Sequence, residues 1–159
     1  MTEPIARIRQ ADVADVPILV EARRRMFVDM GDDCPALDAV DAASAAWLAE
    51  RIPTGAASGL IAEDADGRWI GALSVRHEDT PPSAGNPAGR QSYIFGLWVR
   101  HECRRRGVAR ALVTAAVEDA RERGEGAVLL NATDVGRPLY ESLGFEVAPA
   151  MRLFFDPAS

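Results

Sequence analysis

Hydrophobic and polar residues alternate along several short stretches of the chain, a pattern that predicts β-strands. "IARIR", from Ile5 to Arg9, alternates in the manner of a half-buried strand. "GLIAED" and "WIGALSVRH" flank the short turn "ADGR", which predicts a hairpin. Further on, the apolar stretches predict strands at 92–100 ("SYIFGLWVR"), 127–131 ("AVLLN") and 150–155 ("AMRLFF").

Other stretches repeat their apolar residues every three or four positions, as helices do. The predicted helices run from about 15 to 30, from 36 to 52, from 108 to 123 and from 137 to 145. Asp12 and Asp15 offer caps for the first of them, and Gly31, Gly124 and Gly144 are positioned to end the first, third and fourth. The segment 79–90 is dense in proline and glycine and predicts a loop.

The resulting order of elements contains no repeat and no linker, so we expect a single domain spanning 1–159, with its core at about 5–155. The strand, helix and strand between Tyr93 and Asn131 predict two parallel strands with a right-handed crossover. Ligands of such units bind beyond the carboxyl end of the first strand, against the amino end of the helix. The sequence "RRRGVA" lies at that point.

Three consecutive arginines, Arg104 to Arg106, therefore precede a helix whose dipole already makes its N-terminus positive. The free N–H groups of such an end bind anions, and Gly107 lacks a Cβ that would keep an anion from the backbone. The alternative is a solvated turn of arginines. A Walker A loop requires a lysine, which this chain lacks altogether, and the dinucleotide motif GxGxxG is also missing.

Composition limits the classes of function. The net charge of −6 argues against a general nucleic-acid binder, because phosphate contacts need an excess of basic surface. Two separated cysteines, Cys34 and Cys103, and two histidines, His77 and His101, favour reduced thiols and no metal site. The first ten residues lack the pattern of a signal peptide, and no apolar run is long enough to span a bilayer, so we expect a cytoplasmic protein.

At two places the sequence resembles the GNAT superfamily of N-acetyltransferases. The segment from Arg104 to Ala109 reads R-x-x-G-x-A between a strand and a helix, and "NATDVGRPLYESLGF" ends in Y-x-x-x-G-F. The order of elements from Ile5 to Phe155 is similar as well. The resemblance implies a mixed α/β (α+β) fold: a mostly antiparallel twisted sheet flanked by helices, with a parallel strand–helix–strand unit for the cosubstrate acetyl-CoA.

The resemblance also implies residue roles. The backbone of Leu97 and Val99 is expected to bond the pantetheine arm, and Asn131 to contact it at the end of its strand. The pyrophosphate loop is expected to comprise Arg104, Arg105, Arg106, Gly107, Val108 and Ala109. Tyr140 corresponds to the tyrosine that protonates the departing thiolate. The alternative interpretation makes Leu97, Val99 and Tyr140 ordinary packing residues.

Two functions of different classes follow: an acetyltransferase acting by direct attack of a primary amine of a small molecule or peptide, or a CoA-binding sensor or partner module with little activity. Tyr140 favours the enzyme. His77, Glu78, Glu102 and Asp134 are candidates for the general base, each of which can equally be a surface group. We expect the segments 23–52 and 79–90 to select the acceptor.

Three further residues bear on the site, and one segment bears on assembly. His101 and Gly96 stand where similar sequences commonly carry a proline and a polar residue, and Tyr93 stands near the position of a glutamate base in some of them. The apolar end "MRLFF" suggests pairing in a homodimer, with burial inside the monomer as the alternative.

Overall fold

The computed structural model describes residues 4–156, so the outermost ends of the expected domain, 1–3 and 157–159, lie outside the described residues. Five strands form one sheet in the order β1-β2-β3-β4-β5. The strands are β1 (Arg7–Gln10), β2 (Ala57–Glu63), β3 (Trp69–Asp79), β4 (Arg90–Val99) and β5 (Ala127–Leu130). The α-helices are α1 (Val16–Asp29), α2 (Cys34–Arg51), α3 (Val108–Glu122) and α4 (Arg137–Ser142), with 3₁₀ turns η1 (Val13–Asp15) and η2 (His101–Cys103).

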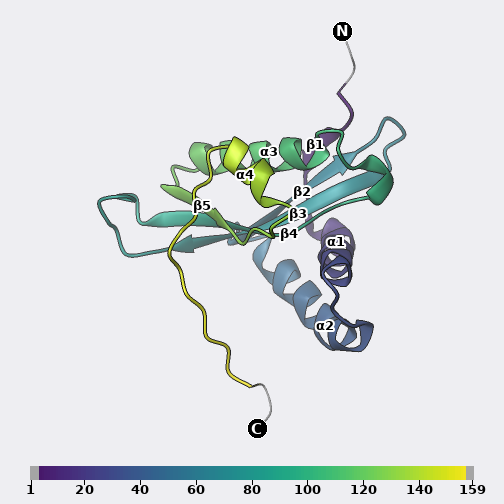
Figure 1. Ribbon diagram of the computed structural model, residues 1–159, viewed down its shortest axis with the longest axis horizontal. Coiled ribbons are helices and arrows are strands. Elements are labelled where there is room, and N and C mark those ends of the chain that lie inside the picture. Colours follow the sequence, from purple (N-terminus) through teal and green to yellow (C-terminus); the bar gives the residue numbers. More distant parts are fainter. Residues whose placement is uncertain (1–3, 157–159) are drawn as a thin grey trace.

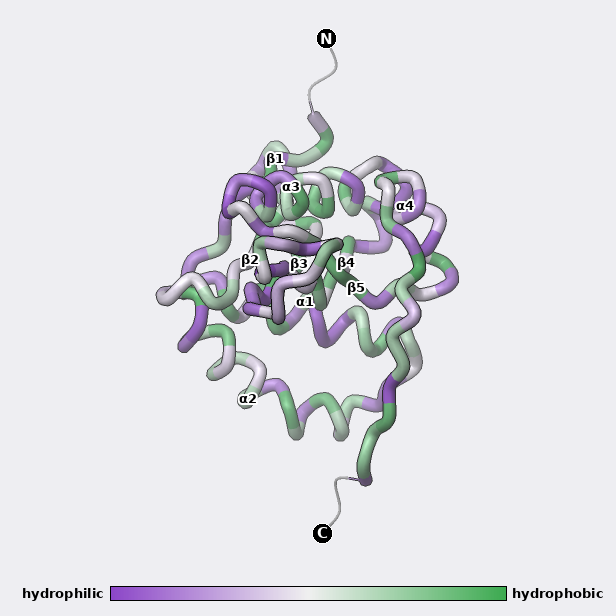
Figure 2. Tube along the Cα trace, turned by 90° about the vertical axis from the view of Figure 1, so that its left-hand side faces the viewer, coloured by the Kyte–Doolittle hydropathy of each residue, from purple (hydrophilic) through white to green (hydrophobic). Residues whose placement is uncertain are grey.

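The sheet lies between two layers of helices. Figure 1 shows α3 and α4 on one face and α1 and α2 on the other, and Figure 2 shows the same layers after a quarter turn. Each face has its own core, because successive strand residues point to opposite faces. Leu73 and Val75 of β3 pack with Leu112 and Val113 of α3, whereas Ala72 packs with Leu19 on the α1 face.

The sheet is antiparallel from β1 to β4, and only β4 and β5 run parallel, joined by α3. This arrangement confirms the predicted fold class, including the parallel strand–helix–strand unit. The predicted glycine terminators are also confirmed, since Gly31, Gly124 and Gly144 follow their helices with φ of +99°, +73° and +94°. Among residues 4–156, no helix combines the length and hydropathy needed to cross a membrane.

The prediction of a last strand at 150–155 is wrong. The segment from Phe145 to Asp156 forms no strand, and Figure 1 shows it running away from β5 along the side of the molecule. A strand needs the hydrogen bonds of a partner edge, and Pro149 removes one donor from this segment. Several of its apolar side chains are consequently more than three-quarters exposed: Met151, Leu153, Phe154 and Phe155.

Candidate functional site

The edge of β4 that faces β5 is open over its second half. The parallel pairing ends at Ile94 opposite Leu130, whereas β4 continues to Val99, still paired with β3. The N–H of Arg100 donates to the carbonyl of Ile70 in β3, at 2.8 Å. Because backbone groups of neighbouring strand residues point to opposite edges, those of Val99 and Leu97 point to the open edge. These are the two residues expected to bind an extended arm.

A bulge in β4 establishes this geometry. Gly96 and Leu97 together face the single residue Leu73, between the pairs Phe95–Ser74 and Trp98–Ala72. Gly96 has a φ of +65°, which a residue with a Cβ adopts only with strain. The backbone conformation therefore explains why Gly96 stands where similar sequences commonly carry a polar residue. The extra residue shifts the alternation, so that Leu97 and Val99 pack on the α3 face.

The loop after β4 leads into an α3 N-terminus without a side-chain cap. Arg105 has a φ of +58°, and Gly107, the N-cap of α3, has a φ of +86°. No side chain accepts a hydrogen bond from the first turn, and no acidic residue lies in it. A Cβ at Gly107 would meet no atom within 4 Å, so the space in front of these N–H groups is open. This combination of free donors, helix dipole and open space suits an anion.

The residues of the expected phosphate loop differ in where their side chains lie. Arg105 and Arg106 are exposed, and neither forms an ion pair within the described part of the chain. The side chain of Val108 is buried in the core, with Ala109 packed against it, so each offers only its backbone. Arg104 instead turns back: its Nε donates to the carbonyl of Val99 at 2.8 Å, and its Nη2 reaches the carboxylate of Asp29 at 2.7 Å.

Asp29, the last residue of α1, forms hydrogen bonds with three side chains of the segment 98–104. Besides Arg104, Trp98 donates its Nε1 to Oδ2 of Asp29 at 3.0 Å, and Nε2 of His101 lies 3.1 Å from the same oxygen. The hydrogen bond from Arg104, followed by those from His101 and Trp98, outweighs partial burial and lowers the pKa of Asp29 to about 2. Sequence reasoning missed Asp29, because its partners lie about 70 residues away and no local pattern marks it.

Tyr140 and Asn131 lie beyond β5, on the other side of the open edge. Asn131 directly follows β5 and is exposed. Tyr140, on α4, is half-buried, with its ring edge-on to Phe145 at 5.9 Å between centroids. Burial raises the pKa of the Tyr140 phenol, so the hydroxyl keeps its proton at neutral pH and is a possible donor.

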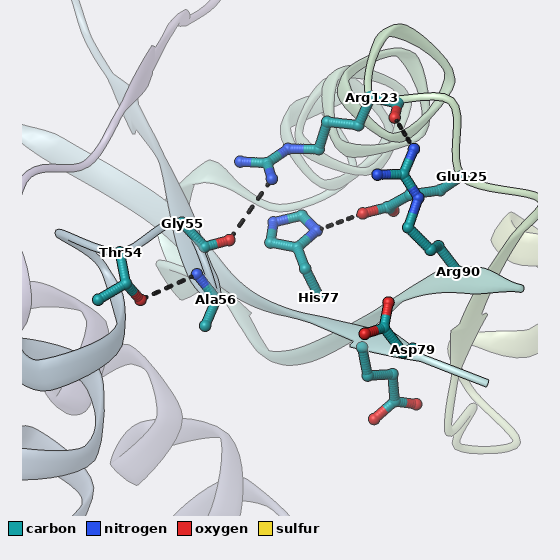
Figure 3. Close-up of a pocket in the computed structure, with 9 residues that line it drawn as sticks. Thr54, Gly55, Ala56, His77, Asp79, Arg90, Arg123 and Glu125 are labelled. Atoms are coloured by element: carbon teal, nitrogen blue, oxygen red, sulfur yellow. Dashed lines mark hydrogen bonds and ion pairs between the residues drawn. The ribbon is translucent and has the colours of Figure 1, made fainter.

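His77, one of the candidate bases, is held at the opposite end of β4. Its Nδ1 lies 2.8 Å from Oε1 of Glu125 and its Nε2 lies 2.9 Å from the hydroxyl of Ser58, while Ser92 hydrogen-bonds to Glu125. The side chains of His77 and Glu125 are only 8% and 5% exposed. Figure 3 shows the contact between His77 and Glu125, and both residues line a hollow of about 370 Å³ together with Arg90 and Arg123. The cluster fastens the end of α3 to the sheet, on the face away from α1.

The remaining candidate bases are placed as follows. Glu78 hydrogen-bonds to Arg76 and to Gln91, both at its own end of the sheet. Glu102 pairs with Arg68 at 3.2 Å across exposed surface. Asp134 is exposed in the loop before α4. Tyr93 lies under the guanidinium of Arg76, 4.1 Å from its ring centroid.

The two cysteines lie far from each other in the chain and differ in burial. Cys34 is exposed, Cys103 is buried, and both are free thiols. Within residues 4–156, no group of three or more His, Cys, Asp or Glu side chains is arranged to hold a metal ion.

Comparison with known proteins extends the resemblance. The model of the acetyltransferase (GNAT) family matches residues 21–145. A GCN5-related N-acetyltransferase from Ralstonia eutropha is 27% identical, with a TM-score of 0.88 over 94% of this chain and 98% of its own. A predicted acetyltransferase from Clostridium acetobutylicum, solved with acetyl-CoA, is also 27% identical, with a TM-score of 0.84 over 94% and 96%.

A more distant structure shares the fold. The aminoglycoside N-acetyltransferase AAC(6')-Iy in complex with CoA is 20% identical, with a TM-score of 0.73 over 96% of this chain and 91% of its own. A search of curated proteins gave no match.

Proposed function

The chain belongs to the GNAT family of acetyltransferases, and from that premise we propose that it transfers the acetyl group of acetyl-CoA to a primary amine of a small molecule or peptide. One observation carries the proposal: the open edge of β4 leads directly to the uncapped N-terminus of α3. An extended arm that ends in a pyrophosphate fits both features at once, the arm as an added strand and the phosphates on the helix end.

The residues of the site divide the binding of acetyl-CoA between them. The backbone of Leu97 and the N–H of Val99, whose carbonyl accepts from Arg104, bond the pantetheine amides, and Asn131 contacts the arm from the β5 side. The N–H groups from Gly107 to Ala109 hold the pyrophosphate. Arg105 and Arg106 add charge from solvent, whereas Arg104, already paired with Asp29, fixes the loop in place.

The chemistry proceeds by direct attack of the neutral amine on the thioester carbonyl. The carbon–nitrogen bond forms, the oxyanion accepts hydrogen bonds from backbone N–H groups of the β4 edge, and the carbon–sulfur bond then breaks. Tyr140 gives its proton to the departing thiolate, and the nitrogen loses one proton to a base or to water. The acetyl-CoA and CoA bound by the Clostridium protein and by AAC(6')-Iy support this choice of cosubstrate.

The test is release of free CoA thiol when a mixed panel of amines is added to the protein and acetyl-CoA. We expect at least one amine to give thiol release that depends on enzyme concentration. Thermal melting in parallel should show that CoA raises Tm by mass action more than pantetheine does at equal concentration. A CoA-dependent rise in Tm without thiol release from any amine would instead support a CoA-binding module.

The remaining features of the proposal concern the setting of this activity. We take residues 1–159 as one acetyltransferase domain that works in the cytoplasm and needs no metal. The exposed apolar segment from Met151 to Phe155 supports association of two copies, because such a segment is a liability while it stays uncovered.

A further inference from the structure

Three consecutive arginines on α1 differ in one respect. Arg24 forms ion pairs with Asp41 at 2.6 Å and with Asp38 at 2.8 Å, and Arg25 pairs with Glu21 at 2.6 Å. Arg23 has no carboxylate within 4.0 Å anywhere in residues 4–156. The charge of Asp41 acts on Arg23 from a distance, but this carboxylate forms its ion pair with Arg24.

The guanidinium of Arg23 lies in a partly apolar environment. Its guanidinium lies 5.2 Å from the ring centroid of Phe27 and 5.5 Å from that of Phe95, and it donates one hydrogen bond, to the hydroxyl of Ser44 at 3.0 Å. Burial lowers the pKa of Arg23, yet a guanidinium stays charged at any physiological pH. The two rings offset part of its charge, while most of its five N–H donors form no hydrogen bond within residues 4–156 and are available to an anion.

The position of Arg23 connects it to the reacting centre. A Cβ placed on Gly96 would lie 3.2 Å from the Cβ of Arg23, so the arginine packs directly against the bulge of β4. Its guanidinium then extends over Phe95, on the face of the sheet that carries α1 and α2. Leu97, the next residue after the bulge, is the one expected to bond the pantetheine arm. An anion on Arg23 would thus lie beside the end of the arm that carries the acetyl group.

We propose that Arg23 binds a carboxylate of the acceptor, and that the substrates are amines carrying a carboxylate close to the amino group, as amino acids do. This inference rests on the proposed function, whose acceptor site it specifies. A single guanidinium with a neighbouring hydroxyl matches one singly charged, planar carboxylate, which it can bind through two parallel hydrogen bonds. The carboxylate would supply the missing partner and orient the amine towards the thioester.

The same charge disfavours another class of acceptor. Polycationic amines such as aminoglycosides would place like charge against Arg23, which forms no ion pair within residues 4–156. The chain therefore differs in expected specificity from AAC(6')-Iy, whose fold it shares.

The experiment compares kcat/KM for matched acceptors, each L-amino acid of a panel against its own carboxamide, in the thiol-release assay with acetyl-CoA. The amide keeps the amine and side chain but removes the negative charge. We expect the acid to be preferred by about ten- to hundredfold, the range of a charge-assisted hydrogen-bonded pair. Arg23→Gln should abolish most of this preference, Arg23→Lys should keep part of it, and the matched control Arg25→Gln, which removes an exposed pair with Glu21, should keep all of it.

A second readout does not need catalysis. In thermal melts of the CoA-bound protein, the preferred amino acid should raise Tm more than its amide does, and Arg23→Gln should remove the difference. Equal use of acid and amide by the wild-type protein, or equal loss of both in Arg23→Gln, would overturn the inference and leave the acetyltransferase proposal intact. If no amine releases thiol, the acetyltransferase proposal fails, and the melts alone decide whether Arg23 binds carboxylates. Arg23→Lys covers the case in which the glutamine variant does not fold.

Discussion

Replacing Asp29 by asparagine tests the contacts that hold the cofactor loop. The amide keeps the shape of the side chain and an oxygen that can accept from Trp98. It removes the charge that faces Arg104 at 2.7 Å and His101 at 3.1 Å. We therefore expect Asp29→Asn to fold and to be less stable than the wild-type protein, with the loop from Arg104 to Gly107 less firmly held.

The magnitude follows from the pKa of Asp29. A decrease from 3.8 to about 2 corresponds to about 2.4 kcal/mol, at about 1.36 kcal/mol for each pH unit. The Asp29 side chain is 33% exposed, so solvent screens these interactions and we reduce the figure to about 1 kcal/mol. For a chain of this size, that loss lowers Tm by about 2–4 °C.

The pH dependence supplies the check. A lowered folded-state pKa stabilises the protein fully above the unfolded value of about 4, and this stabilisation disappears as pH falls towards about 2. Urea unfolding should thus show a constant difference between wild type and Asp29→Asn from pH 7 to 5, which narrows below pH 4. Asp38→Asn, which removes a 68% exposed partner of Arg24, is the control and should have little effect. A difference that persists unchanged at pH 3 or below would refute the electrostatic explanation.

Three other predictions address the site and the assembly. Gly107→Val should abolish acetyl-CoA binding in calorimetry. Its control is Gly67→Val, which has a similar φ of +79° and equally open surroundings, so it should cause similar backbone strain and leave the affinity unchanged. If Gly107→Val binds acetyl-CoA as tightly as the wild-type protein, Gly107 is not part of a phosphate-binding loop. Tyr140→Phe should reduce kcat by about a hundredfold, about 3 kcal/mol, with little change in Tm, and near-normal turnover would mean that water protonates the thiolate. Light scattering should give the mass of a dimer for the wild-type chain and of a monomer for Leu153→Ser/Phe155→Ser, and a monomeric wild type would contradict the pairing.

Local patterns predicted the elements whose stability depends on local residues and on one buried face. Alternation along 69–77 predicted the centre of β3, and the helical repeat from Val108 predicted α3. In each case the apolar residues recur on the one face of the element that packs against the core. Glycines that end helices were equally predictable, since Gly31 and Gly124 supply positive φ that other residues adopt only with strain. The prediction of an anion site rests on the same kind of local pattern, a glycine and free N–H groups at a helix start.

Features that depend on residues far apart in the chain could not be predicted from the sequence. The run at 150–155 has the composition of a strand, but hydrogen bonds from a neighbouring edge decide whether a strand forms. The pairing of Arg104 with Asp29, and of His77 with Glu125, joins residues 75 and 48 positions apart. Gly96 did carry a signal, since an isolated glycine within an apolar strand indicates a bulge, and its φ of +65° agrees.

The acceptor ammonium must lose a proton before it attacks, and the structure limits which groups can accept that proton. The chain has no lysine, and all its basic side chains other than histidine are arginines, which do not act as bases. Both histidines are engaged: His77 with Glu125, in a cluster on the α3 face, and His101 with Asp29. Because His77 lies on the α3 face and the exposed His101 already contacts Asp29, we expect the proton to leave through water or through a carboxylate. The inflection in the pH profile of kcat/KM should consequently follow the pKa of the amine supplied and move to lower pH when a less basic amine replaces it. An inflection fixed near about 6.5 for every amine would instead indicate that a histidine is the base.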